Sequence, residues 1–155
     1  MLRKRRALRL ALIGTTSFDH FKSFEQLAIP TVFFNRVCDE ISTSRVTVND
    51  YEGAFKGVEH LIKNGYKKIA HIAGPDNLLL SHNRLNGFGD ALKKYNIPIN
   101  KKYIIPYDLT EEDARKSAQK LLTMQNRPDA IFCLNDVCTT QTLLVAKEMG
   151  IKVPR

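Results

Sequence analysis

The sequence predicts an α/β fold in which a parallel sheet carries helices on both faces. Three short apolar stretches, centred near residues 71, 104 and 132, recur at about the 30-residue spacing of a strand–helix unit. The segments between them place apolar residues every three or four positions, as helices that cover a sheet do. Because connections between parallel strands are right-handed, these units form one sheet with helices on both sides.

Length and composition indicate one domain or slightly more. The chain has 155 residues, of which 43% are hydrophobic and 26% are charged. No apolar run approaches the ~20 residues of a membrane-spanning helix, so we expect no membrane partner. The formal net charge is +8, but five of the 24 basic residues lie in the first nine positions. The other 19 face 16 acidic residues, which does not indicate a nucleic-acid-binding surface.

The amino-terminal residues 1–12 form a basic segment rather than a secretory signal. Arg9 interrupts its apolar residues, and the stretch from Leu10 to Ile13 is too short for a signal's hydrophobic centre. The three cysteines, Cys38, Cys133 and Cys138, are odd in number and have no CxxC spacing. We therefore expect buried free thiols, as in a reducing cytosol.

The first third of the chain predicts several short elements. Residues 7–13 can form a strand, and phenylalanines spaced by three predict a helix over residues 18–27. Thr31–Phe34 shows no polar alternation, which predicts a strand buried on both faces. Arg45–Val48 is predicted to be an extended crossover between two lobes.

From Asn49 onward, helices and strands alternate. Asn49 and Glu52 have the spacing of a capping box, and Gly65 stands where the first helix should end. Ser81 and Thr110 are predicted to cap the next two helices, and Asn96 and Gly150 to follow helix ends. The predicted strands are 69–73, 103–105 and 130–134.

In open parallel sheets, ligands bind beyond the carboxyl ends of the strands. Polar residues follow every predicted strand of this chain. They are Asn35–Arg36, Gly74–Arg84, Tyr107–Thr110 and Asn135–Asp136. We therefore expect these segments to surround one ligand site.

Arg84 is the foremost candidate for a ligand-binding residue. We place it in the first turn of its helix, where a cation opposes the helix dipole by up to ~1 kcal/mol. A residue kept at such a cost can serve a ligand, and its planar fork suits pairs of hydroxyls or a carboxylate. The alternative is an exposed arginine paired with Asp90 or Asp76.

Asn135, Asp136 and Asn35 carry two interpretations each. Asn135 and Asp136 offer amide and carboxylate groups to a ligand's hydroxyls or ring nitrogens, but either one can cap the last helix. One can cap while the other binds. Asn35 can contact the ligand or can be a turn residue.

No pattern indicates catalysis, a cofactor or a metal. The sequence has no phosphate loop, and Gly87-x-Gly89 lies within a helical pattern rather than after a strand. No nucleophile stands beside a base, so we do not expect an enzyme. The histidines, which show no metal-ligand spacing, are His20, His60, His71 and His82.

Several spaced blocks of the sequence resemble the LacI family of transcription regulators, in the order that the family has. The resemblance covers residues 18–155. Its blocks are IPTVFFNR at 29–36, VTVNDYEGAFKGVEHLIKNGYKKIAHIAGP at 46–75, SHNRLNGFGDAL at 81–92, RPDAIFCLND at 127–136 and MGIKVPR at 149–155.

The resemblance implies a two-lobed effector domain like a periplasmic sugar-binding protein. Residues 13–45 would be the carboxyl-terminal part of the proximal lobe, and residues 46–155 a truncated distal lobe. Family members bind a small effector between the lobes, often a sugar and sometimes a nucleobase-like compound. They act in the cytoplasm as homodimers on operator DNA.

The same resemblance assigns effector contacts to five residues. Arg84 corresponds to the arginine that holds hydroxyl or carboxylate groups, and Asn135 with Asp136 to the polar pair after a later strand. Leu109 stands where an aromatic residue often stacks on the ligand, which argues against a tightly stacked planar ring. Asn35 replaces a usual aspartate, so a contact that depends on that charge would be lost.

The helix-turn-helix and hinge helix of the family have no counterpart in this sequence. We therefore expect no sequence-specific operator binding by this chain alone, although its basic segment can give weak, salt-sensitive DNA binding. Two other functions share the fold. A periplasmic sugar-binding transport protein needs a secretory signal, and a flavodoxin-like α/β enzyme needs catalytic residues at the strand ends.

Overall fold

The computed structural model describes residues 32–35 and 42–154 of the chain. The predicted strand at 7–13, the predicted helix at 18–27, the basic segment and Cys38 lie outside the described residues. The chain divides into two compact units, residues 1–49 and 50–155, and each is described by itself. No helix among the described residues is long and apolar enough to cross a membrane.

The first unit contains a parallel pair of short strands, β1 (Val32–Phe34) and β2 (Ser44–Val46). Phe33 is 2% exposed, whereas Val32 and Phe34 are 40% and 61% exposed. The prediction that this strand is buried on both faces was therefore wrong. Side chains alternate across a strand, and only the side of Phe33 is covered.

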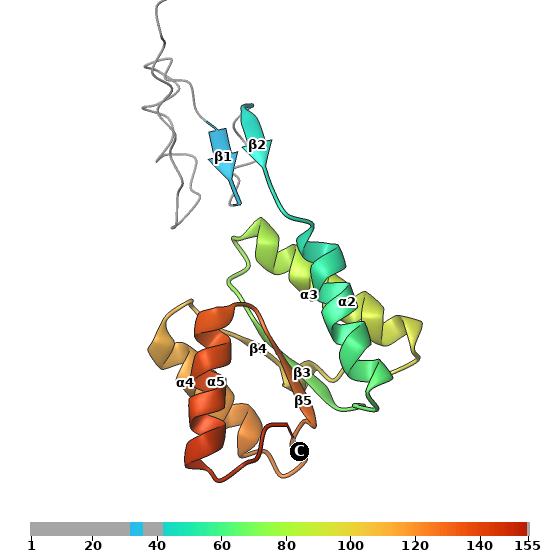
Figure 1. The fold of residues 1–155 in the computed structure, drawn as a ribbon, viewed down its shortest axis with the longest axis vertical. Coiled ribbons are helices and arrows are strands. Elements are labelled where there is room, and N and C mark those ends of the chain that lie inside the picture. The colour runs from blue at the N-terminus through green and yellow to red at the C-terminus, as the bar shows by residue number, and fades with distance from the viewer. Residues whose placement is uncertain (1–31, 36–41, 155) are drawn as a thin grey trace, which may run out of the picture. The chain divides into compact units, whose positions relative to one another are not determined.

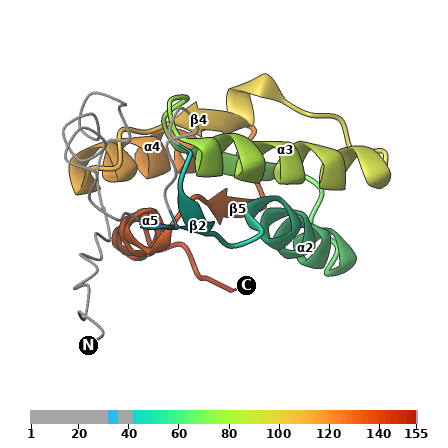
Figure 2. The same ribbon diagram turned by 90° about the horizontal axis from the view of Figure 1, so that it is seen from above.

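The second unit has three parallel strands in the order β4-β3-β5, and its sheet carries helices on both faces, as predicted (Figure 1). Helices α2 and α3 lie side by side against one face (Figures 1 and 2), and α4 and α5 pack on the other. In chain order the elements are α2 (Asp50–Lys63), β3 (Ile69–Ala73), α3 (Leu79–Lys94), the 3-10 turn η1 (Lys101–Tyr103), β4 (Ile104–Pro106), α4 (Glu111–Leu122), β5 (Ala130–Cys133) and α5 (Asp136–Glu148).

The central strand β3 is buried along its whole length and divides the core into two clusters. Ala70 and Ile72 pack with α4 and α5, while Ile69 packs with α2 and α3. His71 lies on the α3 side, with its ring 5.1 Å from the rings of both Phe88 and Phe132. Helices thus cover both faces of β3, and for this reason its sequence is mostly apolar instead of alternating with polar residues.

Three helices end where the sequence predicted. Gly65, Asn96 and Gly150 have φ angles of +90°, +54° and +68°, the left-handed conformation that stops a helix. The amide of Gly65 donates to Ile62 and that of Asn96 to Lys93, so the last carbonyl groups are satisfied. Glycine tolerates this conformation because it has no Cβ atom, and asparagine because its short polar side chain can form local hydrogen bonds.

Two predicted element starts were wrong. Helix α3 begins at Leu79 without a side-chain cap, and Ser81 lies buried inside it. A turn closed by the Leu78 amide and the Pro75 carbonyl leads into the helix, and the burial of Leu78 fixes this start. Strand β4 begins one residue later than predicted because η1 occupies Lys101–Tyr103.

Candidate functional site

Arg84 belongs to α3, but its guanidinium lies at the carboxyl end of β5. Its Nη1 donates a hydrogen bond to the carbonyl oxygen of Leu134, the residue that follows this strand. Because α3 begins at Leu79, Arg84 stands in the second turn and not in the first. The predicted cost against the helix dipole therefore does not apply, since that effect fades beyond the first turn.

The partner of Arg84 is Asp50, the first residue of α2. One carboxylate oxygen, Oδ1, accepts from both Nε at 2.8 Å and Nη2 at 2.6 Å. The Asp50 side chain is 6% exposed and that of Arg84 is 24% exposed. The predicted alternative partners were therefore wrong. Asp90 instead accepts from Tyr51 and Lys93.

Asp50 was not predicted as a site residue, because the residues around it indicate only the start of a helix. The pair spans 34 residues, and no local spacing connects the two side chains. The available signal was an acidic residue at the start of the helix that precedes β3 and packs against α3. Such a residue faces α3 only because α2 and α3 are neighbours, which the fold decides.

The guanidinium of Arg84 keeps hydrogen-bonding capacity after these contacts. An arginine carries five N–H groups, of which three donate to Asp50 and Leu134. Two N–H groups, one on each terminal nitrogen, donate to no other described residue. Asp50 Oδ2 likewise accepts no hydrogen bond within the described part of the chain. The pair thus offers two donors and an acceptor beside the carboxyl end of β5.

Asn135 caps α5, so the capping interpretation is confirmed for it. Its Oδ1 accepts from the Cys138 amide at 3.0 Å and from the Tyr107 hydroxyl at 2.6 Å. The side-chain amide nitrogen donates to no described residue and stays available to a ligand. Asp136, the next residue, is exposed and begins the helix.

Tyr107 begins one of the segments that were expected to surround the ligand site, but no contact of its own was predicted for it. It is the first residue after β4, and it is buried while its hydroxyl reaches Asn135 at the end of β5. This contact fixes the orientation of the Asn135 amide from a neighbouring segment. In the sequence, only its position after a predicted strand could indicate this contact. An aromatic side chain at the end of one strand is long enough to contact a residue at the end of another strand.

Leu109 and Asn35 share a left-handed backbone, with φ angles of +73° and +68°. Leu109 is half-buried and packs against the core cluster beneath α4 and α5, so its side chain is already engaged by the protein. Asn35 is exposed, and its amide donates to Val46 at 2.8 Å. Asn35 belongs to the first unit, whereas the other four predicted residues belong to the second.

Two buried polar groups lie in or beside β3. Ser81 Oγ is buried with no hydrogen-bond partner among the described residues. A Cβ atom at Gly74 would stand 2.4 Å from this oxygen and 2.4 Å from Leu134 Cδ2, so a larger residue there would require the side chains of Ser81 or Leu134 to shift. His71 is fully buried, and burial lowers its pKa to about 4, although a hydrogen bond with the Phe132 carbonyl opposes the shift.

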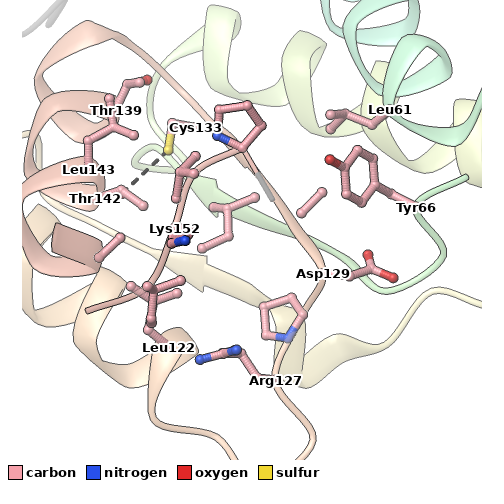
Figure 3. A pocket seen from close by; sticks show the side chains of 17 residues that line it. Leu61, Tyr66, Leu122, Arg127, Asp129, Cys133, Thr139, Thr142, Leu143 and Lys152 are labelled. Atoms are coloured by element: carbon pink, nitrogen blue, oxygen red, sulfur yellow. Dashed lines mark hydrogen bonds between the residues drawn. The ribbon is translucent and has the colours of Figure 1, made fainter. Parts of the chain in front are cut away.

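The structure also shows a pocket of about 360 Å³ along the free edge of β5 (Figure 3). Its wall includes Tyr66, Arg127 and Leu143, and none of the predicted site residues. Cys133 lies in this wall, with Sγ 3.5 Å from Thr142 Oγ1. A hydrogen bond from the Cys138 thiol lowers the pKa of Cys133 to about 7. The described residues contain no cluster of three metal-ligating side chains.

The fold and the site together define a class of protein, an open α/β domain that presents polar side chains where its strands end. Residues 58–155 match the family of periplasmic binding protein-like domains, and the chain belongs to that family.

The relatives of the chain confirm the resemblance to LacI-family regulators. The chain is 37% identical to the transcriptional repressor CytR of Escherichia coli over 125 aligned residues. The aligned region covers 81% of this chain and 37% of CytR. The structure of a LacI-family regulatory protein from Chloroflexus aggregans matches this chain with a TM-score of 0.78 and 28% sequence identity. The match covers 92% of this chain and 51% of the Chloroflexus chain. The complex of the regulator CelR with cellobiose has a TM-score of 0.74 and 26% identity, over 82% and 39% of the two chains. The chain thus spans about 37% of the length of that curated relative.

Proposed function

We propose that the chain is the effector-binding part of a LacI-type transcriptional regulator. It binds a small hydroxylated molecule, a sugar or a nucleobase-like compound, at the carboxyl ends of β3, β4 and β5. Arg84 is the anchor of the site, and Asn135 and Asp136 supply further polar contacts. The family pattern implies an effector contact for Leu109 and, in the first unit, for Asn35.

The position of Arg84 carries this proposal. Its guanidinium is fixed by Asp50 and by the Leu134 carbonyl, and two N–H groups are left for a ligand. A fixed donor loses little conformational entropy when it binds, which favours affinity. The CelR structure, which contains cellobiose, supports a sugar-type effector, and CytR, which is named a repressor, supports a role in regulation rather than catalysis.

The remaining parts of the proposal concern the whole regulator. It acts in the cytoplasm, forms a homodimer and contacts operator DNA through a helix-turn-helix. The described residues contribute the effector site. Occupation of that site would shift the equilibrium between DNA-binding states, because a ligand favours the state that it binds more tightly.

Titration calorimetry tests the proposal with ribose, glucose, cellobiose, cytidine and adenine as probes. We expect at least one probe to bind, and we expect Arg84→Gln to weaken it about tenfold or more, as loss of a charged hydrogen bond does. Arg115→Gln is the matched control, since Arg115 of α4 pairs with Glu148 of α5. Circular dichroism verifies that both variants fold. Equal binding by Arg84→Gln and the wild type, or no binding of any probe, would overturn the proposal.

The alternative is a part of a periplasmic sugar-binding transport protein, since the family to which residues 58–155 belong is named for such proteins. The two functions differ in the behaviour of the natural full-length protein. A regulator stays with the cytoplasmic fraction and shifts an operator fragment in a gel. A transport protein is released with the periplasmic fraction and binds the sugar without any effect on DNA.

A further inference from the structure

We propose that Asp50 makes this site selective for uncharged, hydroxyl-bearing effectors over anionic ones. The inference deepens the proposed function and rests on it, because it concerns the class of molecule that Arg84 accepts. An isolated arginine would serve a carboxylate or a phosphate as well as a hydroxyl pair. Asp50 resolves this choice of ligand, because its carboxylate already neutralises the positive charge of Arg84.

The first argument is charge balance. Asp50 and Arg84 form an ion pair at 2.6 Å whose carboxylate is almost fully buried. An anion that approached the same guanidinium would also approach the carboxylate of Asp50. Two like charges that share one partner in a partly buried site repel each other strongly, because solvent screens them little. A neutral ligand meets no such repulsion.

The second argument is the pattern of donors and acceptors that remains. Arg84 offers two N–H donors, and Asp50 Oδ2 offers an acceptor. A hydroxyl group can donate and accept, so neighbouring hydroxyls of a polyol can satisfy both residues at once. A carboxylate or a phosphate dianion only accepts hydrogen bonds, so it would leave the Asp50 oxygen without a donor.

The third argument is the distribution of charge around the carboxyl ends of the strands. The residues there are mainly acidic, although the whole chain has a net positive charge. The segments that follow the three strands are residues 74–84, 107–113 and 134–141, and Arg84 is their only arginine or lysine. The acidic residues in these segments are Asp76, Asp108, Glu111, Glu112, Asp113 and Asp136. Basic residues stand instead before the strands, at Lys67, Lys68, Lys101, Lys102 and Arg127. An anionic effector would therefore meet a negative edge, which lowers its local concentration.

The test compares neutral and anionic probes of similar shape. Glucose is paired with glucuronate, and ribose with ribose 5-phosphate, in calorimetric titrations of the wild type and Asp50→Asn. We expect the wild type to favour the neutral member of each pair by about tenfold or more. Asp50→Asn should lower the ratio of neutral to anionic affinity by about tenfold or more. Asp90→Asn, which removes a carboxylate of α3 that does not contact Arg84, should leave this ratio unchanged. Asp50→Ser, which also removes the carboxylate, is the second variant should Asp50→Asn fail to fold.

A second readout does not depend on the effector. In proton–nitrogen correlation spectra, added sulfate should leave the Arg84 Nε–H resonance of the wild type unchanged and shift it in Asp50→Asn. A wild-type preference for the anionic probes, a ratio that Asp50→Asn does not alter, or an equal response of both proteins to sulfate would overturn the inference. If no sugar binds the wild type, the proposed function fails, and the sulfate titration still decides the role of Asp50.

Discussion

A Cβ atom on Gly87 would stand 2.3 Å from the carbonyl oxygen of Tyr51. The same atom would lie 3.0 Å from the Phe55 amide nitrogen and 3.1 Å from Ala54 Cβ. Helices α2 and α3 therefore meet backbone to backbone at this position. The contact between these two helices also brings Asp50 of α2 within reach of Arg84 of α3, so the ion pair of the site depends on it.

Gly87→Ala is expected to destabilise the fold by about 1–3 kcal/mol, because a backbone carbonyl cannot move aside for the added methyl group. Urea denaturation followed by circular dichroism measures the change. Gly53→Ala is the matched control, since nothing lies within 4 Å of its Cβ position. Alanine should stabilise α2 there by up to about 1 kcal/mol. Equal effects of the two substitutions would contradict the close approach of the helices.

His71 should make stability depend on pH between 6.5 and about 4. Burial lowers the pKa of His71 from 6.5 to about 4, with nearby Arg84 adding to the effect. The folded state therefore resists protonation more than the unfolded state, so stability is complete above pH 6.5 and falls as the pH drops towards 4. The loss amounts to about 3 kcal/mol at most.

Urea titrations across this pH range, on the wild type and His71→Phe, measure that contribution. The variant should show a shallower decline, because phenylalanine has no proton to gain. The imidazole resonances of His71 should also titrate near pH 4 rather than near pH 6.5. A midpoint close to 6.5 would contradict the buried neutral ring.

Glu59 should contribute to stability in a lower pH range. It accepts hydrogen bonds from Lys94 at 2.8 Å, Lys63 at 3.0 Å and Tyr95 at 2.9 Å, and thereby joins the ends of α2 and α3. These contacts, that of Lys94 foremost, lower the pKa of Glu59 from 4.5 to about 2. The contribution is complete above pH 4.5 and is lost as the pH falls through 2.

Thermal unfolding of the wild type and Glu59→Gln between pH 5 and pH 2 tests this expectation. The two proteins should differ most at pH 5 and converge as the pH approaches 2. Glu112→Gln is the control, because the ion pair of Glu112 with Lys116 is exposed and such pairs add little stability. A constant difference across the range would show that protonation of Glu59 does not matter.

Ser81→Ala and Thr110→Ala should have opposite effects on stability. Ser81 Oγ is buried without a partner among the described residues, so its removal should raise the free energy of unfolding by about 1 kcal/mol. Thr110 Oγ1 accepts from the Asp113 amide at 3.2 Å and caps α4, so its removal should cost about 1 kcal/mol. Chemical denaturation compares the two variants, and a clear loss of stability in Ser81→Ala would reveal a bound partner for its hydroxyl.

Local patterns of the sequence predicted most of the second unit. The strand at 69–73 was placed correctly, and the helix ends at Gly65, Asn96 and Gly150 follow from residues that accept a left-handed backbone. Thr110 was recognised as a cap because that contact spans only three residues. The start of α3 was missed because the burial of Leu78, a tertiary effect, outweighed the local preference of Ser81 for a cap.

The candidate site was predicted in position but not in its contacts. The rule on strand ends placed Arg84 and Asn135 at one edge of the sheet, where their segments do meet. The Asp50–Arg84 pair and the Tyr107–Asn135 bond cross 34 and 28 residues of sequence. No helical or strand period connects residues at such distances, so the pattern could not name these partners.

The sequence by itself determined the parallel α/β order, the helix ends and the arginine after β3, because each depends on periodicity or on residues adjacent in the chain. The tertiary structure alone decided that Asp50, and neither Asp76 nor Asp90, shares the charge of Arg84. That choice follows from the packing of α2 on α3, which Gly87 permits and which brings together side chains from distant parts of the sequence.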